Sequence, residues 1–294
     1  MRRVAIPEPL ASRPFTIAEG SKAGLGEARM YGADLYRPTR SVRTVTEPTS
    51  TRDRAAATVL ALPDDVAFSH TTAAELWDLP LPRESEGGRL HVIRPTTSSR
   101  VRRAGCQGHR GLESRETAVL KGLKVTGLTD TWCDLGESLG LDDLVVVGDA
   151  VARRLRDVDP LRRTLSRRNR PRGALVLREA LDLVRLGAES PMESRCRLVF
   201  VRSGLPEPEL NAVVQFDGGG FLCRADFVWR KQRVIAEYQG GDHFATFRRG
   251  DDDISRRLLA EDEHWKYIEM TKHDYFNPAR RAALVTRLAA YLKA

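Results

Sequence analysis

The clearest pattern of apolar and polar positions lies in the last third of the chain. Residues 221–229 and 233–239 are two apolar, strand-like runs, and a short polar turn at 230–232 joins them. This arrangement is typical of a β-hairpin. A helical pattern precedes the hairpin, and a helix, a strand and a final helix follow it. Residues 188–294 are therefore predicted to form a compact α/β unit with a mixed sheet.

A second pattern opens the chain. Residues 14–24 predict a short helix that starts after Thr16, whose hydroxyl can cap it, and that closes at Gly24. Residues 25–35 predict a second helix, and residues 36–45 alternate as a strand or wing would. We expect a winged-helix-like α+β region that could dock on DNA through its second helix. Any small pair of helices would give the same pattern, and that alternative stays open.

A chain of 294 residues corresponds to about two domains. The arginine- and proline-containing stretch at 166–173 is the best candidate for a boundary, which predicts domains 1–172 and 173–294. No catalytic constellation is expected in residues 1–150. His70 stands at a predicted helix start, where we expect it to cap or pack rather than to bind a ligand.

Two carboxylates face each other in the predicted hairpin. If the strands pair symmetrically about the turn, Asp226 lies directly opposite Glu237, with Cβ atoms about 5 Å apart. Like charges inside apolar runs are costly, and a hard divalent cation such as Mg²⁺ would compensate them. The alternative is that both side chains face solvent or pair with arginines such as Arg224 and Arg233.

Three further residues extend this acidic pair. Glu193 follows Ser190 by three residues at a helix start, so it fits a capping box as well as an additional acidic group near the metal. Gln239 shares a strand face with Glu237 because strand side chains alternate. His243 follows the second strand and could orient or deprotonate a water molecule.

Arginines account for most of the excess charge. The net charge is +8, and residues 151–172 contain nine arginines against two aspartates. Such a cluster suits contact with phosphates, although a solvated basic linker or helix face explains it equally well. Arg256 and Arg257, on the helix after the hairpin, are candidates to neutralise phosphate charge, or are ordinary solvent-exposed arginines. The candidate nucleic-acid-binding residues are Arg153, Arg154, Arg163, Arg167, Arg168, Arg256 and Arg257.

The cysteines and the apolar segments indicate the cellular compartment that we expect for the protein. Four scattered cysteines form no C-x-x-C pair, which favours separate reduced thiols over a zinc site or a disulfide framework. No apolar run approaches the roughly 20 residues that a membrane-spanning helix needs. The first residues lack the apolar segment of a signal peptide. We therefore expect a cytoplasmic protein without a membrane partner, in an oligomeric state that the sequence does not define.

The C-terminal motifs resemble a known family. The segments E-S-P-M-E-S-R, R-A-D-F, A-E-Y-Q-G and D-H, followed by a helix and the strand K-Y-I-E-M-T, are similar to endonuclease-like domains related to very-short-patch-repair endonucleases. These domains belong to the PD-(D/E)-x-K nuclease superfamily, and the similarity covers roughly residues 186–292. The preceding region more loosely resembles the N-terminal part of abortive-infection type IV antitoxin-like proteins.

The resemblance implies a restriction-endonuclease-like α/β domain with a mixed central sheet. It implies that Asp226 and Glu237 bind Mg²⁺ or Mn²⁺ and that Glu193 is the acidic residue of the first helix. Gln239 occupies the position of the motif lysine, which departs from the family pattern, and an extra glycine in the following loop displaces His243.

These observations predict a metal-dependent DNA endonuclease, in repair or defence. An alternative is an antitoxin-like DNA-binding regulator with an inactive nuclease fold, favoured by Gln239. A scaffold without a nucleic-acid role is the third possibility, and the arginine cluster and the acidic pair argue against it.

Overall fold

The structure is a computed structural model that describes residues 4–240 and 257–293. All four cysteines are buried free thiols, as the sequence predicted. No helix in these described ranges is long and apolar enough to cross a membrane.

The chain divides into two compact units, each made of two segments. The first unit combines residues 1–143 with 161–177, and the second unit combines residues 144–160 with 178–294. A single boundary at residue 172 does not describe this division, because residues 144–160 group with the C-terminal segment. Helices α7 (Leu141–Leu155), α8 (Asp159–Arg167) and α9 (Ala174–Leu183) each begin in one unit and end in the other.

The N-terminal part of the first unit contains short elements around a small core. They are α1 (Glu8–Ala11), β1 (Phe15–Thr16), α2 (Ile17–Lys22), α3 (Glu27–Met30) and β2 (Val42–Arg43). Thr16 caps α2 as predicted, in a capping box with Glu19, and Gly24 follows the helix with a φ of 83°. The predicted wing is reduced to the two-residue β2, which pairs antiparallel with β1. Arg43 is 3% exposed and donates to the carbonyl of Met30, so it is a structural residue.

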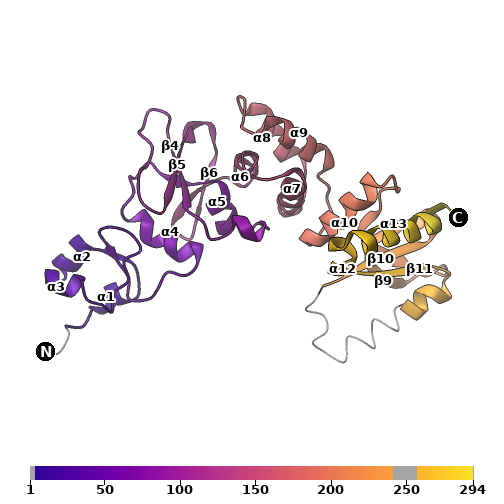
Figure 1. The fold of residues 1–294 in the computed structure, drawn as a ribbon, viewed down its shortest axis with the longest axis horizontal. Coiled ribbons are helices and arrows are strands. Elements are labelled where there is room, and N and C mark those ends of the chain that lie inside the picture. Colours follow the sequence, from indigo (N-terminus) through magenta and orange to yellow (C-terminus); the bar gives the residue numbers. More distant parts are fainter. Residues whose placement is uncertain (1–3, 241–256, 294) are drawn as a thin grey trace. The chain divides into compact units, whose positions relative to one another are not determined.

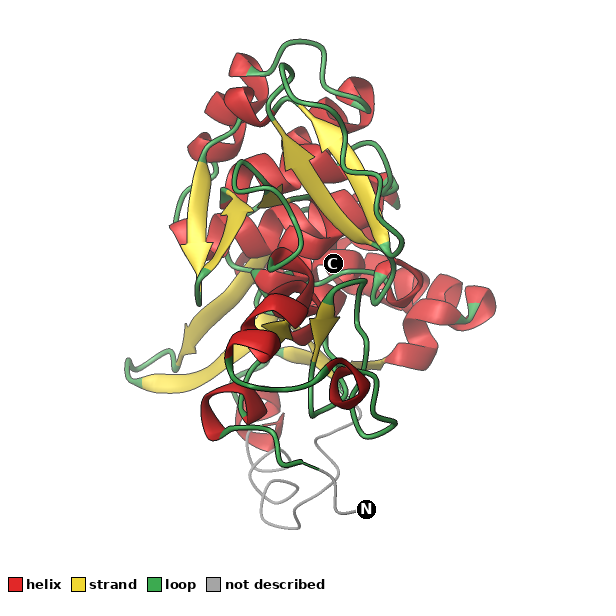
Figure 2. Cartoon of the chain, turned by 90° about the vertical axis from the view of Figure 1, so that its left-hand side faces the viewer, coloured by secondary structure: helices red, strands yellow, loops and turns green. Residues whose placement is uncertain are grey.

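A mixed five-stranded sheet forms the larger part of the first unit (Figure 2). Its order is β5-β4-β3-β7-β6, with β3 antiparallel to β4 and parallel to β7. The strands are β3 (Ala67–Phe68), β4 (Leu90–Arg94), β5 (Cys106–Arg110), β6 (Thr117–Leu120) and β7 (Leu123–Thr126). The flanking helices are α4 (Thr51–Val59), α5 (His70–Leu76) and α6 (Leu128–Leu135), with single 3₁₀ turns at Arg83–Ser85 and Leu112–Ser114.

A close backbone contact holds the arginine-rich segment, residues 167–172, against the end of α6. Gly173 has a φ of 72°, and a Cβ atom built there would lie 1.8 Å from the carbonyl oxygen of Gly136. Only glycine combines the left-handed conformation with so close an approach. The contact fixes the position of residues 167–172 within the first unit.

The second unit contains a four-stranded mixed sheet in the order β11-β10-β9-β8. Its strands are β8 (Glu209–Gln215), β9 (Phe221–Trp229), β10 (Val234–Gln239) and β11 (Lys266–Thr271), and a 3₁₀ turn at Arg230–Gln232 joins β9 to β10. Strand β10 pairs antiparallel with β9 and parallel with β11. Its helices are α10 (Pro191–Arg202), α12 (Lys272–Phe276) and α13 (Pro278–Lys293), and a helix whose described part is 257–262 precedes β11.

Apolar side chains cover both faces of this sheet. On one face, α10 and α13 lie over the sheet (Figure 1). Phe200 of α10 and Leu288 of α13 pack there with Phe227 and Trp229 of β9. On the other face, Ala260 packs with side chains from the middle of β9 and β10. The predicted mixed sheet is confirmed, and the predicted helix, hairpin, helix, strand and helix occur in that order. Strand β8, between α10 and the hairpin, and the short helix α12 were not predicted.

A buried ion pair attaches α7 to the second unit. The Nη2 atom of Arg197 lies 3.1 Å from Oδ2 of Asp149, and these side chains are 0% and 1% exposed. The other carboxylate oxygen of Asp149 accepts the backbone N–H of Arg185 at 2.8 Å. Arg197 also donates to the carbonyl of Leu183 at 2.7 Å.

Candidate functional site

The β9–β10 hairpin has the register that the sequence predicted. Val234 pairs with Trp229, and Ala236 pairs with Phe227. Extending the ladder by one position would set Glu237 opposite Asp226, but the backbone pairing stops before this pair. Instead, Oδ2 of Asp226 accepts the N–H of Tyr238 at 2.8 Å. A side chain therefore replaces the strand partner at the point where β9 and β10 separate.

Burial and neighbouring carboxylates shift the pKa of Asp226 strongly at the point where β9 and β10 separate. Glu237 is only 8% exposed, and Asp226 is partly buried. Burial, together with the charges of Glu193, Glu237 and Glu189, raises the pKa of Asp226 to about 7, against the lowering effect of the Tyr238 N–H. A carboxyl group held in this way is destabilised when it ionises, and a cation would relieve that cost.

The two arginines named as possible partners of the pair form ion pairs with other carboxylates. Arg224 forms an ion pair with Glu189, and Arg233 forms one with Asp217. The bond to Glu189 raises the pKa of Arg224, and the charge of Asp226, which still acts on this arginine, helps to raise it.

Glu193 has a different environment from the one predicted. Ser190 caps α10 by accepting the N–H of Glu193 at 3.2 Å, as expected. The carboxylate of Glu193 does not complete a capping box, because its Oε2 accepts the N–H of Glu189 at 2.8 Å and the Asn211 amide at 2.5 Å. The predicted capping box is wrong in its second half. These bonds fix the buried carboxylate in place beside the hairpin.

The remaining predicted site residues fall into two groups. Gln239 is the last residue of β10, where it pairs with Thr271 of β11. His243 and Arg256 lie outside the described residues. Within the described ranges, the ligand atoms of Glu193, Asp226 and Glu237 do not form a group in which all lie within 4.8 Å of one another.

Part of the arginine cluster serves the fold of the first unit. Arg168 lies 3.0 Å from Asp130 and 2.5 Å from Asp134, two aspartates whose side chains are 0% and 1% exposed. Arg167 also forms an ion pair with Asp130, and it lies 2.8 Å from Glu116. Both arginines were candidates for contact with nucleic acid, and the structure shows them in ion pairs within the first unit instead.

The other arginines that were predicted to bind nucleic acid differ in whether another group of the protein already bonds to them. Arg153, Arg154 and Arg163 have exposed side chains, and Arg153 also donates to the carbonyl of Glu189. Arg257 is exposed but forms an ion pair with Glu261 at 2.9 Å, one helical turn later.

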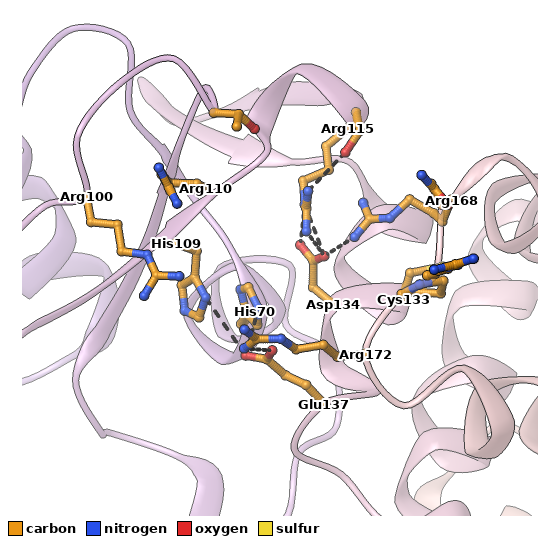
Figure 3. Close-up of a pocket in the computed structure, with 15 residues that line it drawn as sticks. His70, Arg100, His109, Arg110, Arg115, Cys133, Asp134, Glu137, Arg168 and Arg172 are labelled. Carbon is orange, nitrogen blue, oxygen red and sulfur yellow. Dashed lines mark hydrogen bonds and ion pairs between the residues drawn. The ribbon is translucent and has the colours of Figure 1, made fainter.

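A second site, in the first unit, was not predicted. A cavity of about 370 Å³ is lined by His70, His109, Glu137 and several arginines (Figure 3). In Figure 3, Arg100, Arg110 and Arg172 surround the histidine end, and Arg115 and Arg168 lie on either side of Asp134. Burial raises the pKa of Cys133 to about 12, so its thiol is not a nucleophile at neutral pH.

Three histidines lie close together beside this cavity, and two of them, His70 and His109, are in its lining. His70 opens α5, His91 lies on β4 and His109 lies on β5. Each offers one nitrogen to a group whose members all lie within 4.8 Å of one another. The predicted role of His70 as a capping or packing residue misses this cluster. One signal was available: His91 and His109 follow His70 within the same stretch of about forty residues.

Comparison with known proteins gives only distant similarity. Two proteins of Mycobacterium tuberculosis strains, whose names describe them only as uncharacterised, are each 34% identical over 117 residues. The match covers 40% of this chain and 43% of each relative, less than half of their length. No known family and no solved structure matches the chain.

Proposed function

We propose that the second unit is a divalent-metal-dependent nuclease that hydrolyses phosphodiester bonds in DNA. The observation that carries this proposal is the position of Asp226 and Glu237 where β9 and β10 separate, with the pKa of Asp226 raised to about 7. The order α10–β8–β9–β10–helix–β11, with β10 parallel to β11, supports a restriction-endonuclease-like fold.

The donor set suits a hard cation. Carboxylate oxygens are the preferred ligands of Mg²⁺ and Mn²⁺, and the mutual repulsion around Asp226 is the condition that such an ion relieves. Asp226 and Glu237 would hold the ion. When bound, it would polarise the scissile phosphate and lower the pKa of a water molecule.

The protein's own side chains have separate tasks in this proposal. Glu193, fixed by Asn211 and the Glu189 N–H, presents its carboxylate from the start of α10. Gln239 orients the attacking water through its amide, and His243 assists it. The winged-helix-like region and exposed arginines such as Arg163 bind the DNA backbone in a salt-dependent way.

Cleavage of supercoiled plasmid and branched DNA with Mg²⁺ or Mn²⁺ tests the proposal. Asp226→Asn and Glu237→Gln are expected to reduce the rate by about 100-fold or more. Asp226→Asn keeps an oxygen that can accept the Tyr238 N–H, so the strand ends should keep their geometry. Glu209→Gln is the matched control, because Glu209 is an exposed carboxylate on β8 of the same sheet. Equal rates in all four proteins would refute the assignment.

A DNA-binding regulator with an inactive nuclease fold is the second candidate. Gln239 favours it, because an amide cannot supply the positive charge of the lysine found in related motifs. The regulator predicts salt-dependent DNA binding without cleavage by the wild type, and a gain of cleavage in Gln239→Lys. Cleavage by the wild type that Gln239→Lys does not increase would reject it.

A further inference from the structure

We propose that His70, His91, His109 and Glu137 form a binding site for a transition-metal ion of the Zn²⁺ class in the first unit, separate from the carboxylate site of the proposed nuclease. The four residues come from α5, β4, β5 and the segment after α6, so the fold rather than local sequence brings them together. The inference does not depend on the proposed function.

The distances among these side chains suit a shared ion. The Nε2 atom of His70 lies 3.2 Å from Oε1 of Glu137, and Nδ1 of His109 lies 3.8 Å from the same oxygen. The Nε2 atom of His109 lies 3.0 Å from Nδ1 of His91. Ligand atoms of a tetrahedral Zn²⁺ are about 3.3 Å apart, because each lies about 2.0–2.1 Å from the metal. One ion takes a single nitrogen from each ring, and one nitrogen of each histidine lies within 4.8 Å of the others. The His70 and His109 rings are stacked with 19° between their planes, so the His109 ring would turn and the Glu137 carboxylate would move toward the ion on binding.

The donor types select the class of metal. Three imidazoles and one carboxylate favour Zn²⁺, Co²⁺ or Ni²⁺, whereas Mg²⁺ and Ca²⁺ prefer oxygen alone. His70 is buried and His91 and His109 are partly buried, so the three imidazoles face one another with little competition from solvent. With Glu137 ionised, the set would also supply one negative charge.

Outer contacts already orient two of the ligands. The Nδ1 atom of His70 lies 2.9 Å from the Ser69 hydroxyl, which leaves Nε2 directed at Glu137. Arg172 lies 3.0 Å from the second oxygen of Glu137, so one carboxylate oxygen is fixed and the other faces the histidines (Figure 3). Metal-binding histidines and carboxylates commonly have such partners, which hold the ring orientation and the tautomer.

Backbone geometry at His70 agrees with this assignment. The residue has a φ of 51°, in the left-handed region that non-glycine residues seldom adopt. Ser69, immediately before it, donates its N–H to the carbonyl of His91 at 3.0 Å. The left-handed turn and the link to β4 bring the His70 ring to His109, 3.7 Å away between ring centroids.

The ion would be reachable from solvent. His70, His109 and Glu137 line the 370 Å³ cavity, and His91, His109 and Glu137 also line a neighbouring cavity of about 390 Å³. An ion that joined the four ligands would have access from both.

Metal binding to the full chain tests the proposal. Zn²⁺ content and the visible spectrum of bound Co²⁺ are measured in excess Mg²⁺, which occupies oxygen sites but competes poorly for imidazoles. The wild type is expected to retain one ion and to show the absorption bands of four-coordinate, nitrogen-bound Co²⁺. His109→Ala is expected to weaken Zn²⁺ binding by on the order of 100-fold or more, and Ser69→Ala by about 10–100-fold. His273→Ala, an exposed histidine of α12, should bind as the wild type does.

The wild-type spectrum decides the question even if a variant fails to fold. Absence of retained Zn²⁺ and of four-coordinate Co²⁺ bands in excess Mg²⁺ would overturn the proposal. Equal metal content in the wild type, His109→Ala and Ser69→Ala would overturn it as well. Loss of binding in Asp226→Asn but not in His109→Ala would place the ion at the carboxylate site instead.

Discussion

The buried ion pair between Asp149 and Arg197 gives the sharpest test of how the second unit is built. Asp149→Ala removes one partner and leaves a guanidinium that is 0% exposed. Arg197 would keep the carbonyl of Leu183 and a carboxylate oxygen of Glu207 at 3.3 Å, a side chain that is itself 37% exposed. Removal of one member of a buried pair costs about 3–5 kcal/mol, because the partly exposed Glu207 compensates the remaining charge only in part.

That cost is large against the roughly 5–15 kcal/mol that stabilises a typical domain. Urea unfolding followed by tryptophan fluorescence measures it, since Trp229 and Trp265 are buried in the second unit. The midpoint should fall markedly in Asp149→Ala. Substituting both partners by apolar residues, Asp149→Leu with Arg197→Met, should recover much of the loss because no buried charge remains.

Glu261→Ala is the matched control. Glu261 forms an ion pair with Arg257 in the same unit, but the two side chains are 44% and 50% exposed. Exposed pairs contribute about 0–1 kcal/mol, so this midpoint should hardly change. A shift in Asp149→Ala no larger than the shift in Glu261→Ala would show that burial of the pair has been misjudged.

Three further predictions concern single residues. Burial raises the pKa of Asp226 from 3.8 to about 7. Between pH 3.8 and about pH 7, the folded state therefore keeps a proton on Asp226 that the unfolded state has released. The stability of the metal-free protein should therefore fall as pH rises from about 4 to about 7, and in Asp226→Asn this part of the slope should vanish in urea titrations with EDTA. Gly173→Ala should lower the thermal midpoint much more than Gly24→Ala, because both glycines have positive φ but only the first meets a carbonyl oxygen at 1.8 Å. Arg168→Ala should lower the free energy of unfolding by about 3 kcal/mol or more, because it removes one ion-pair partner from each of two buried aspartates. Arg163→Ala should leave stability unchanged and reduce the salt dependence of DNA binding. A larger loss of stability in Arg163→Ala than in Arg168→Ala would contradict the structure.

Sequence reasoning succeeded where the interactions are local. The turn at 230–232 and the two apolar runs fixed the hairpin register, because strand pairing about a short turn leaves few alternatives. Thr16 and Ser190 were identified as N-caps for a similar reason, since a capping side chain bonds within three residues of itself.

It failed where residues distant in sequence meet. The partners of Arg167 and Arg168 lie more than thirty positions earlier, so a run of arginines gave no indication that two of them are used internally. The histidine cluster joins three elements over about forty residues. Residues 144–160 group with the C-terminal segment, and the Asp149–Arg197 pair that attaches them has no signature in the sequence.

The bond between Asp226 and the Tyr238 N–H has an evolutionary consequence. This aspartate substitutes for a strand partner as well as supplying a proposed metal ligand. A lineage that lost cleavage would still be selected to keep it, because its removal leaves a partly buried backbone N–H without an acceptor. Retention of the aspartate among relatives would therefore report on inheritance of the fold. Whether a relative cleaves DNA would have to be judged from other site residues, whose side chains do not replace a strand partner in this way.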